Sequence, residues 1–400
     1  MSKIAILGFG TVGSGVYDVI RTNCDSIAEK TGSKLEIGHI LDIRDFDSHP
    51  EKHLFTKDFS VILNDSEVEI VAEVIGGINP AYTFTKQCLE AGKSVVTSNK
   101  ELVAKHGTEL IALAKANGCS YLFEASVGGG IPLIDPLCRA MSGNKINKIC
   151  GILNGTTNYI LTQMATCGSD FETALSGAQK NGYAEANPAA DIEGIAACRK
   201  IAILSSVAWG AQTDCDKIKT TGISDITTND MVFAQKLGFT VKLIAYSTID
   251  NNRISAMVEP MFVSSENPLY FVNDVFNAGL IEGNATGNVM FYGKGAGKDA
   301  TASAVVADII SICTGVAKSF PVSWKKSDSI CMGDEPTEKF AYYVRCKKDE
   351  LATAKNIFEI KQTAEVGGEA AFITDAMKSD DFAAKIAQMG SVSKSMRVLY

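Results

Sequence analysis

The sequence lacks the patterns that mark several classes of protein. No segment carries the long, uninterrupted apolar run that a membrane-spanning helix needs, and no run of like charges forms a basic arm or an acidic tail. The eleven cysteines are scattered without a single Cys-x-x-Cys pair, so neither a zinc site nor a disulfide framework is indicated. The net charge of −8 argues against a nucleic-acid or anionic-membrane partner.

The remaining composition is that of an ordinary globular protein. The chain has 400 residues, of which 46% are hydrophobic and 21% charged, and this length suggests two or three domains. Its first residues run directly into an apolar, strand-like segment, so we expect no secretory signal. Free thiols in such a chain fit a reducing compartment, and we expect a cytoplasmic protein.

Strand-like and helix-like segments alternate over the first part of the chain. Strands are predicted at residues 3–7, 35–41, 69–75, 94–97 and 120–124, with helices at 14–24, 80–91 and 107–117. This alternation predicts an α/β fold with a doubly wound, parallel Rossmann sheet.

The rest of the sequence predicts two further domains. The Rossmann domain would span 1–137 and be completed by a returning helix near 300–320, and an α+β domain would span 138–320. Residues 335–400 form a predicted βαββαβ module. Its elements are expected at 340–346, 349–358, 359–366, 370–377, 380–389 and 392–399.

A glycine-rich turn follows the first predicted strand and precedes a predicted helix. Gly8 would make the tight turn, Gly10 would let the backbone approach a pyrophosphate, and Gly13 would let helix and strand pack closely. Free N–H groups at the start of a helix bind phosphate. We therefore predict a dinucleotide site formed by Gly8, Phe9, Gly10, Thr11, Val12 and Gly13.

The end of the second predicted strand bears on the choice between NAD and NADP. If the strand ends at Leu41, Asp42 favours NAD, because a carboxylate there binds the ribose hydroxyls. If it ends at Ile43, Arg44 favours NADP, and Lys57 could add positive charge near the 2′-phosphate. A solvated surface charge is the alternative interpretation of Arg44, so the choice of cofactor stays open.

Lysine is the candidate for proton transfer in this chain. Hydride transfer to a carbonyl needs a proton donor, and the usual donor, histidine, occurs only four times, always in the nucleotide half. Lys200 lies in an apolar predicted helix, where a lysine tends to have a lowered pKa unless it extends to solvent. Lys100 follows Ser98 at the carboxyl edge of the sheet, where α/β proteins bind ligands, although surface lysines are common.

Several longer motifs resemble those of homoserine dehydrogenases. They are GFGTVG (8–13), SNK (98–100), EASVGGGIP (124–132), GILNGTTNY (151–159), GYAEANPAAD (182–191), RK (199–200) and GKGAG (293–297) followed by TAS (301–303). The resemblance spans roughly residues 1–320. It implies an NAD(P)-dependent oxidoreductase acting on a CH–OH group, which reversibly reduces L-aspartate 4-semialdehyde to L-homoserine in threonine, methionine and isoleucine biosynthesis.

The resemblance also implies roles for individual residues. Lys200 matches the catalytic acid/base, and Lys100 matches the lysine at the hydride-transfer site. The substrate-binding positions are Glu185, Asp191, Thr156 and Tyr183, and Ser98, Lys100, Gly182 and Gly297 join the cofactor positions. Glu124, Val127, Gly129 and Ile131 match a monovalent cation site, usually sodium, built largely from backbone oxygens.

One position departs from the pattern of this family. The helix motif D-x-E-G-x-D-A-x-x-K is matched at Asp191 and Lys200, but Ala196 stands where a second aspartate is expected. Positions 196 and 200 share a helix face, so we expect a lower pKa of Lys200 and reduced turnover, unless Glu185 or a water replaces the carboxylate. Neutral drift is the alternative.

The C-terminal module resembles an ACT domain, a unit that often binds amino acids as effectors. Inhibition by L-threonine and a purely structural role in dimerisation are both open. We expect a homodimer or homotetramer. Two other functions stay open as well: a related dehydrogenase of amino or oxo acids, and a catalytically weak sensor that binds nucleotide and amino acid.

Overall fold

The chain folds into two compact units. The computed structural model describes residues 2–333 and 335–400. The first unit comprises the described residues of Met1–Ile149, Arg199–Asp216 and Ile281–Met332, and the second those of Cys150–Cys198, Lys217–Leu280 and Gly333–Tyr400. These boundaries differ from the three domains expected from the sequence, which remain a prediction.

A parallel six-stranded sheet in the order β3-β2-β1-β4-β5-β6 forms the centre of the first unit. Its strands are β1 (Ser2–Leu7), β2 (Leu35–Leu41), β3 (Phe55–Thr56), β4 (Val68–Glu73), β5 (Ser94–Thr97) and β6 (Tyr121–Leu122). The first-unit helices are α1 (Thr11–Thr22), α2 (Cys24–Thr31), α3 (Phe59–Asn64), α4 (Ala81–Glu90), α5 (Lys100–Ala116), α11 (Lys298–Cys313) and α12 (Val316–Ser319). The predicted parallel α/β sheet is confirmed.

The apolar character of the strands follows from burial on both faces of this sheet. Four successive residues of β1, from Ile4 to Leu7, are fully buried, although neighbouring side chains of a strand point to opposite faces.

Several predicted bounds are wrong. The helix expected over 14–24 ends at Thr22, because the backbone of Asn23 leaves the helical conformation before α2 begins. The helix expected over 107–117 begins at Lys100, where Asn99 caps it, and the strand expected over 120–124 comprises only Tyr121–Leu122.

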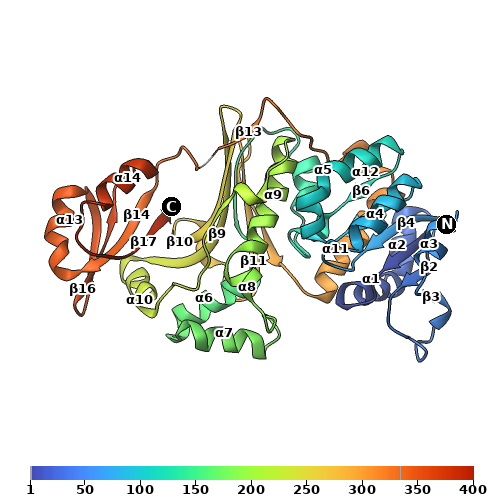
Figure 1. Ribbon diagram of the computed structural model, residues 1–400, viewed down its shortest axis with the longest axis horizontal. Coiled ribbons are helices and arrows are strands. Elements are labelled where there is room, and N and C mark those ends of the chain that lie inside the picture. The colour runs from blue at the N-terminus through green and yellow to red at the C-terminus, as the bar shows by residue number, and fades with distance from the viewer. Residues whose placement is uncertain (1, 334) are drawn as a thin grey trace. The chain divides into compact units, whose positions relative to one another are not determined.

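Helix α11 lies beside α1 in the first unit, although the two are far apart in sequence (Figure 1). A Cβ atom at Gly15 would lie 2.9 Å from Cβ of Ala302, so glycine permits the close approach. Lys298 and Asp18 form an ion pair of 2.6 Å across the same two helices.

The second unit contains most of a mixed sheet of 11 strands. Nine of these strands carry residues of the second unit: eight follow the order β11-β7-β9-β10-β17-β14-β16-β15, and the ninth, β8, pairs with β10. The strands after β6 are β7 (Ile146–Ile152), β8 (Lys219–Thr220), β9 (Phe239–Asp250), β10 (Arg253–Ser264), β11 (Phe276–Gly283), β12 (Gly287–Lys294), β13 (Cys331–Met332), β14 (Ala341–Lys347), β15 (Ile360–Val366), β16 (Glu369–Thr374) and β17 (Val392–Leu399).

The remaining helices are α6 (Gly155–Cys167), α7 (Phe171–Lys180), α8 (Ala189–Ile192), α9 (Ile195–Trp209), α10 (Thr228–Leu237), α13 (Leu351–Ile357) and α14 (Ser379–Ile386). Thr156 in α6 and Asp191 in α8 are predicted to bind the substrate. The long β-prone stretch of the sequence is the hairpin β9–β10. Asn251 and Asn252 both have positive φ, as the two central residues of a type I′ hairpin turn require.

The elements of the C-terminal module follow in the order expected from the sequence: β14, α13, β15, β16, α14 and β17. Side chains of β14 alternate between two buried faces. Tyr342 stacks on Phe382 of α14 with ring centroids 3.7 Å apart, while Tyr343 on the opposite face donates a hydrogen bond to Asp230 of α10. Its resemblance to an ACT domain remains a prediction.

Two chain-wide observations complete the fold. Among the described residues, no helix combines the length and apolar character needed to cross a membrane. All eleven cysteines are free thiols.

Candidate active site

The turn between β1 and α1 is built around its glycines. Gly8 has a φ of +95°, a conformation that side chains disfavour. A Cβ atom at Gly13 would lie 1.9 Å from the carbonyl oxygen of Gly8, so only glycine lets the helix pack against the turn. A Cβ atom at Gly10 would meet nothing within 4 Å, which leaves that side open. Because Gly10 is the N-cap and has no side-chain acceptor, the first N–H groups of α1 stay available to a phosphate.

The end of β2 closes this turn with a carboxylate. β2 ends at Leu41, and Oδ2 of Asp42 accepts a hydrogen bond of 2.8 Å from the N–H of Phe9. Arg44 pairs with the same carboxylate at 2.9 Å and also donates to the carbonyl oxygen of Phe9 at 2.9 Å. Hydrogen bonds from Arg44 hold the pKa of Asp42 well below its usual range.

The two residues differ in what they present to solvent. The side chain of Asp42 is 8% exposed and that of Arg44 is 56% exposed. The accessible charge at the end of β2 is therefore positive. Lys57, the third predicted residue of this region, pairs with Asp45 at 2.7 Å on the surface.

Helix α5 begins with Lys100, directly after a turn held by buried hydrogen bonds. Oγ1 of Thr97 donates to Glu73 at 2.7 Å and accepts from the N–H of Asn99 at 2.9 Å, which fixes Ser98 between them. Glu73 is fully buried, and burial raises its pKa. A cation at the first position of a helix opposes the helix dipole, so helix stability does not account for Lys100.

A salt bridge in the first unit joins the helices that carry the two predicted lysines. Arg199 of α9 and Glu101 of α5 pair at 3.0 Å. Arg199 immediately precedes Lys200, and Glu101 immediately follows Lys100. Both lysines are half-buried. The Arg199–Glu101 ion pair thus joins the segments that contain Lys200 and Lys100, which are far apart in sequence.

In the second unit, the start of α6 holds the loop that follows α7. Oγ1 of Thr156 donates to the carbonyl oxygen of Tyr183 at 2.6 Å, and Nδ2 of Asn154 donates to Oδ1 of Asp191 at 2.7 Å. The ring of Tyr183 is 44% exposed and packs edge-to-face against Tyr159 with centroids 5.1 Å apart. Glu185 is exposed in the same loop. Thr156, Tyr183 and Asp191 are therefore held by one helix start.

Sequence reasoning did not single out Asn154. Its side chain caps α6 by accepting from the N–H of Thr157 at 2.9 Å, and it orients Asp191 at the same time. The available signal was its place as an asparagine directly before a helical segment, where such residues are preferred. The Arg199–Glu101 pair was also missed, because no local pattern joins residues so far apart.

The remaining two glycines predicted to bind the cofactor both adopt conformations that favour glycine. Gly182, after α7, has φ +74°, and Gly297, the N-cap of α11, has φ +116°. They belong to different units, Gly182 to the second and Gly297 to the first.

The loop predicted to hold a cation is folded around the carboxylate of Glu124. This buried side chain accepts hydrogen bonds of 2.6–2.9 Å from three successive N–H groups, beginning at Leu133. Burial raises its pKa, and it also raises the pKa of the neighbouring Asp308, which accepts from the N–H of Glu124 at 2.9 Å. The carboxylate is thus occupied by the backbone, and oxygens for a cation would have to come from the main chain.

Three main-chain oxygens of this loop are available as cation ligands. The carbonyl groups of Val127, Gly129 and Ile131 accept no hydrogen bond from the described residues. Gly129 has φ +59°, and a Cβ atom there would lie 2.5 Å from the backbone of Gly295. Hard cations prefer such oxygen ligands, so the residues present fit a monovalent cation.

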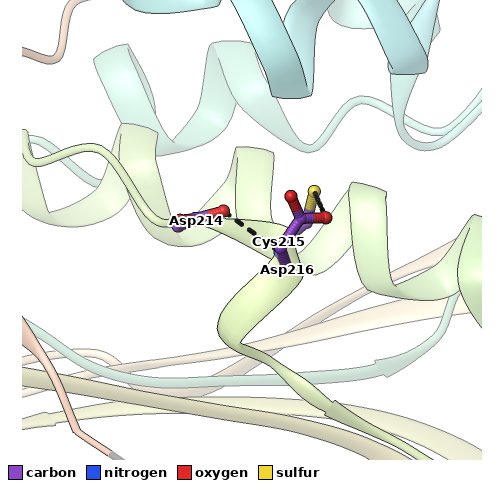
Figure 2. A group of neighbouring side chains, drawn as sticks. All are labelled: Asp214, Cys215 and Asp216. Atoms are coloured by element: carbon purple, nitrogen blue, oxygen red, sulfur yellow. Dashed lines mark hydrogen bonds between the residues drawn. The ribbon is translucent and has the colours of Figure 1, made fainter.

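A separate acidic group follows α9. Figure 2 shows Asp214, Cys215 and Asp216, whose ligand atoms all lie within 4.8 Å of one another. Oδ1 of Asp214 accepts from the N–H of Asp216 at 3.1 Å, as in a local turn. Burial and the two carboxylates raise the pKa of the Cys215 thiol, and a protonated thiol is a poor metal ligand.

Comparison with known proteins identifies the same family, homoserine dehydrogenase, along most of the chain. The family model described as homoserine dehydrogenase matches residues 132–310, and that described as the NAD binding domain of homoserine dehydrogenase matches residues 8–124. A homoserine dehydrogenase of Bacillus subtilis is 40% identical over 314 residues, 78% of this chain and 72% of that relative. One of Corynebacterium glutamicum is 42% identical over 315 residues, 77% of this chain and 71% of that relative.

One solved structure is similar over nearly the whole chain, and a second over four fifths of it. A homoserine dehydrogenase of Thiobacillus denitrificans superposes with a TM-score of 0.90 at 33% identity, covering 99% of this chain and 98% of that one. A hyperthermophilic archaeal homoserine dehydrogenase in complex with NADPH has a TM-score of 0.66 at 30% identity, covering 80% and 99%. These findings do not favour the alternative functions. The chain belongs to the homoserine dehydrogenase family, the NAD(P)-dependent oxidoreductases that interconvert L-aspartate 4-semialdehyde and L-homoserine.

Proposed function

We propose that Lys200 is the acid/base of this reaction and that Lys100 assists it. When bound, the reduced nicotinamide supplies a hydride to the aldehyde carbon. The ammonium group of Lys200 would donate a proton to the aldehyde oxygen, which gives the alcohol, and the neutral amine would take this proton back in the reverse direction. The observation that carries this assignment is the Arg199–Glu101 pair, which ties the segment of Lys200 to that of Lys100 at the carboxyl edge of the sheet.

The substrate's amino group would be bound by carboxylates of the second unit. Asp191 is oriented by Asn154, and Glu185 is exposed in the loop that Thr156 holds through Tyr183. Opposite charges make these carboxylates suitable partners for an ammonium group, while the hydroxyl of Thr156 and the ring of Tyr183 would line the pocket.

NADP is the cofactor that the electrostatics favour. The carboxylate of Asp42 already accepts from Phe9 and Arg44, so it has little capacity left for ribose hydroxyls. Arg44 presents an exposed guanidinium that can bind a 2′-phosphate, with Lys57 as a weaker contributor because Asp45 neutralises it. We also propose that the main-chain oxygens of Val127, Gly129 and Ile131 bind sodium and thereby rigidify their loop. The main-chain oxygen of Glu124, which accepts a long hydrogen bond of 3.4 Å from the N–H of Val127, would be the fourth ligand.

The oligomeric state, location and regulation are further proposals. A homodimer or homotetramer is expected for this enzyme, and eleven free thiols favour the reducing cytoplasm. The βαββαβ order of the C-terminal module supports the ACT resemblance. Added L-threonine should lower the activity if the module binds this effector, whereas a purely structural module would leave the activity unchanged.

The assignment is tested by steady-state kinetics with purified protein. L-homoserine should reduce NADP with a larger kcat/KM than NAD, and a panel of other small hydroxy amino acids should react far more slowly. Tight NADPH binding without turnover of homoserine would contradict the proposed acid/base role.

A further inference from the structure

A buried lysine lies in β9 of the second unit, away from both lysines assigned to the reaction in sequence. Lys242 is 1% exposed, and its Nζ donates to Oδ1 of Asn158 at 3.1 Å, the carbonyl oxygen of Val272 at 2.6 Å and Oδ1 of Asn273 at 2.9 Å. No carboxylate of the described residues forms an ion pair with it. An ammonium group has three donors, and three uncharged oxygens satisfy them here.

These acceptors belong to α6 and to the segment 272–276. Asn158 of α6 also donates through Nδ2 to the carbonyl oxygens of Val272 and Phe276, each at 3.1 Å. Oγ1 of Thr162, one turn further along α6, accepts from the N–H of Asp274 at 3.0 Å. Hydrogen bonds therefore hold segment 272–276 against one side of α6, and Lys242 donates hydrogen bonds to both the helix and the segment.

The same segment reaches the first residue of the helix. A Cβ atom at Gly155 would lie 2.6 Å from the carbonyl oxygen of Val275, so the backbone of the segment closes over the helix start. The flanking residues Asn154 and Thr156 are those that hold Asp191 and Tyr183. A displacement of segment 272–276 would therefore move the predicted substrate-binding residues.

We propose that Lys242 is a positioning residue for the substrate: it holds Asn158 and segment 272–276 together, and thereby fixes the first turn of α6. This inference rests on the proposed substrate-binding role of Asp191 and its neighbours. Lys242 itself contacts no reacting group. Its loss should impair binding of the amino acid more than binding of the nucleotide, since all the predicted cofactor positions except Gly182 belong to the other unit.

The first test replaces the amine with an apolar side chain of similar length. In Lys242→Met, KM for L-homoserine should rise about tenfold, a fraction of the roughly 10²-fold that a remote 1 Å misplacement can cost, while KM for NADP should change far less. Equal changes in the two KM values, or none, would overturn the proposal.

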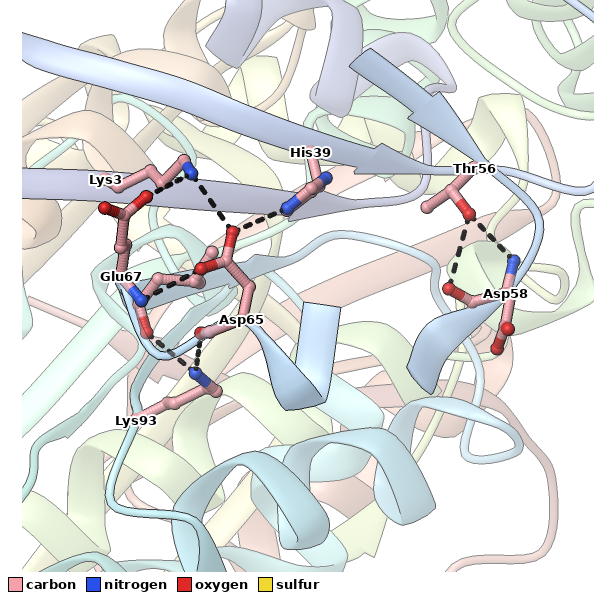
Figure 3. A network of polar contacts seen from close by, with 8 residues as sticks. Lys3, His39, Thr56, Asp58, Asp65, Glu67 and Lys93 are labelled. Carbon is pink, nitrogen blue, oxygen red and sulfur yellow. Dashed lines mark hydrogen bonds and ion pairs between the residues drawn. The ribbon is translucent and has the colours of Figure 1, made fainter. Parts of the chain in front are cut away.

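A second buried lysine supplies the matched control. Lys93 of the first unit is 6% exposed and donates to the carbonyl oxygens of Asp65 at 2.6 Å and Val68 at 2.9 Å (Figure 3). Lys93→Met removes a buried amine from similar surroundings, and it should lower the melting temperature without changing KM for homoserine. A rise in that KM equal to that of Lys242→Met would mean that any buried amine gives the effect, and would refute positioning by Lys242.

A double-mutant cycle tests the link itself. Asn158→Ala should reproduce the rise in KM for homoserine, and the double variant with Lys242→Met should be no worse than the poorer single variant, because the two act through one contact. Multiplying effects would overturn the proposal. If Lys242→Met does not fold, the KM split in Asn158→Ala decides alone. A wild-type protein that does not turn over homoserine would instead refute the proposed function.

Discussion

The two units hold their ligand-facing groups by different means. In the first unit the backbone sets the geometry: Gly8 takes a positive φ, and Gly13 admits a carbonyl oxygen where a side chain would collide. In the second unit, side-chain hydrogen bonds do the same work, through Asn154, Thr156 and Asn158. A backbone site tolerates almost no added atom, whereas a side-chain site fails when an atom is removed.

The largest effect is expected where a side chain performs the chemistry. Lys200→Ala removes the proposed proton donor, so kcat for homoserine oxidation should fall about 10³-fold, within the usual range for general acid–base catalysis. NADPH binding, followed by fluorescence titration, should not change, because the backbone of the turn is intact. Turnover near the wild-type rate would remove Lys200 from the mechanism.

Two glycine variants separate packing from ligand approach in the first unit. Gly13→Ala places a Cβ atom 1.9 Å from an oxygen, so the fold should lose about 1–3 kcal/mol and NADP affinity should fall with it. Gly10→Ala meets no protein atom and has negative φ, so its melting temperature should be that of the wild type while NADP affinity still falls. Equal melting temperatures of the two variants would contradict the packing argument.

The second unit should also respond to pH through Lys242. Burial lowers the pKa of this lysine to about 8 from its usual 10.5, with Asp274 as the charged group that opposes the shift. Between these values the unfolded chain binds the proton more tightly, so stability should rise with pH, by about 3 kcal/mol in total at about 1.4 kcal/mol per pH unit. Comparing unfolding of the wild type and Lys242→Met from pH 7.5 to 10.5 isolates this term. A parallel pH dependence in both proteins would refute it.

Cofactor choice tests a place where the first unit binds through a side chain and not through its backbone, the guanidinium of Arg44. In Arg44→Ala, KM for NADP should rise about tenfold, the value of one charge-assisted contact, while KM for NAD changes little. Lys57→Ala is the matched control and should have a smaller effect, because Asp45 already pairs with this lysine. An unchanged ratio of the two cofactors in Arg44→Ala would favour the surface-charge interpretation.

The smallest effect is expected at Ala196. This residue is 4% exposed and precedes Lys200 by one helical turn. In Ala196→Asp the restored carboxylate should keep the lysine charged and raise kcat by about 1.4- to 2.3-fold, the equivalent of the roughly 0.2–0.5 kcal/mol of an i,i+4 ion pair. Full kcat–pH profiles of both proteins would reveal the change. An unchanged or lower kcat would contradict the expectation, and an unchanged kcat would favour neutral drift.

The sequence predicted best where local chemistry decides the structure. The glycine spacing at Gly8, Gly10 and Gly13 identified the turn, and apolar periodicity gave the order of the six C-terminal elements. The sequence left open those features that depend on contacts between distant residues, such as the cofactor preference. The end of β2 at Leu41 would by itself have favoured NAD, but the pairing of Asp42 with both Arg44 and Phe9 changes that interpretation.

Other parts of the site were beyond sequence reasoning for the same reason. In the sequence, nothing distinguishes Lys242 from other lysines in strands. Its burial and its three hydrogen-bond partners from α6 and segment 272–276 become visible only in the structure. The pairing of Arg199 with Glu101 likewise joins α9 to α5 across a long stretch of chain. Such contacts depend on tertiary packing, which local propensity does not encode.

The hydrogen bond from Phe9 to Asp42 has a consequence for the thermodynamics of cofactor binding. This hydrogen bond holds the glycine-rich turn (residues 8–13) in place without a ligand, so the conformational freedom of the turn is already lost during folding. A dinucleotide then meets donors that are already aligned, and its binding free energy is not reduced by ordering a loop. Calorimetry of NADP binding should accordingly show a smaller unfavourable entropy for the wild type than for Asp42→Ala.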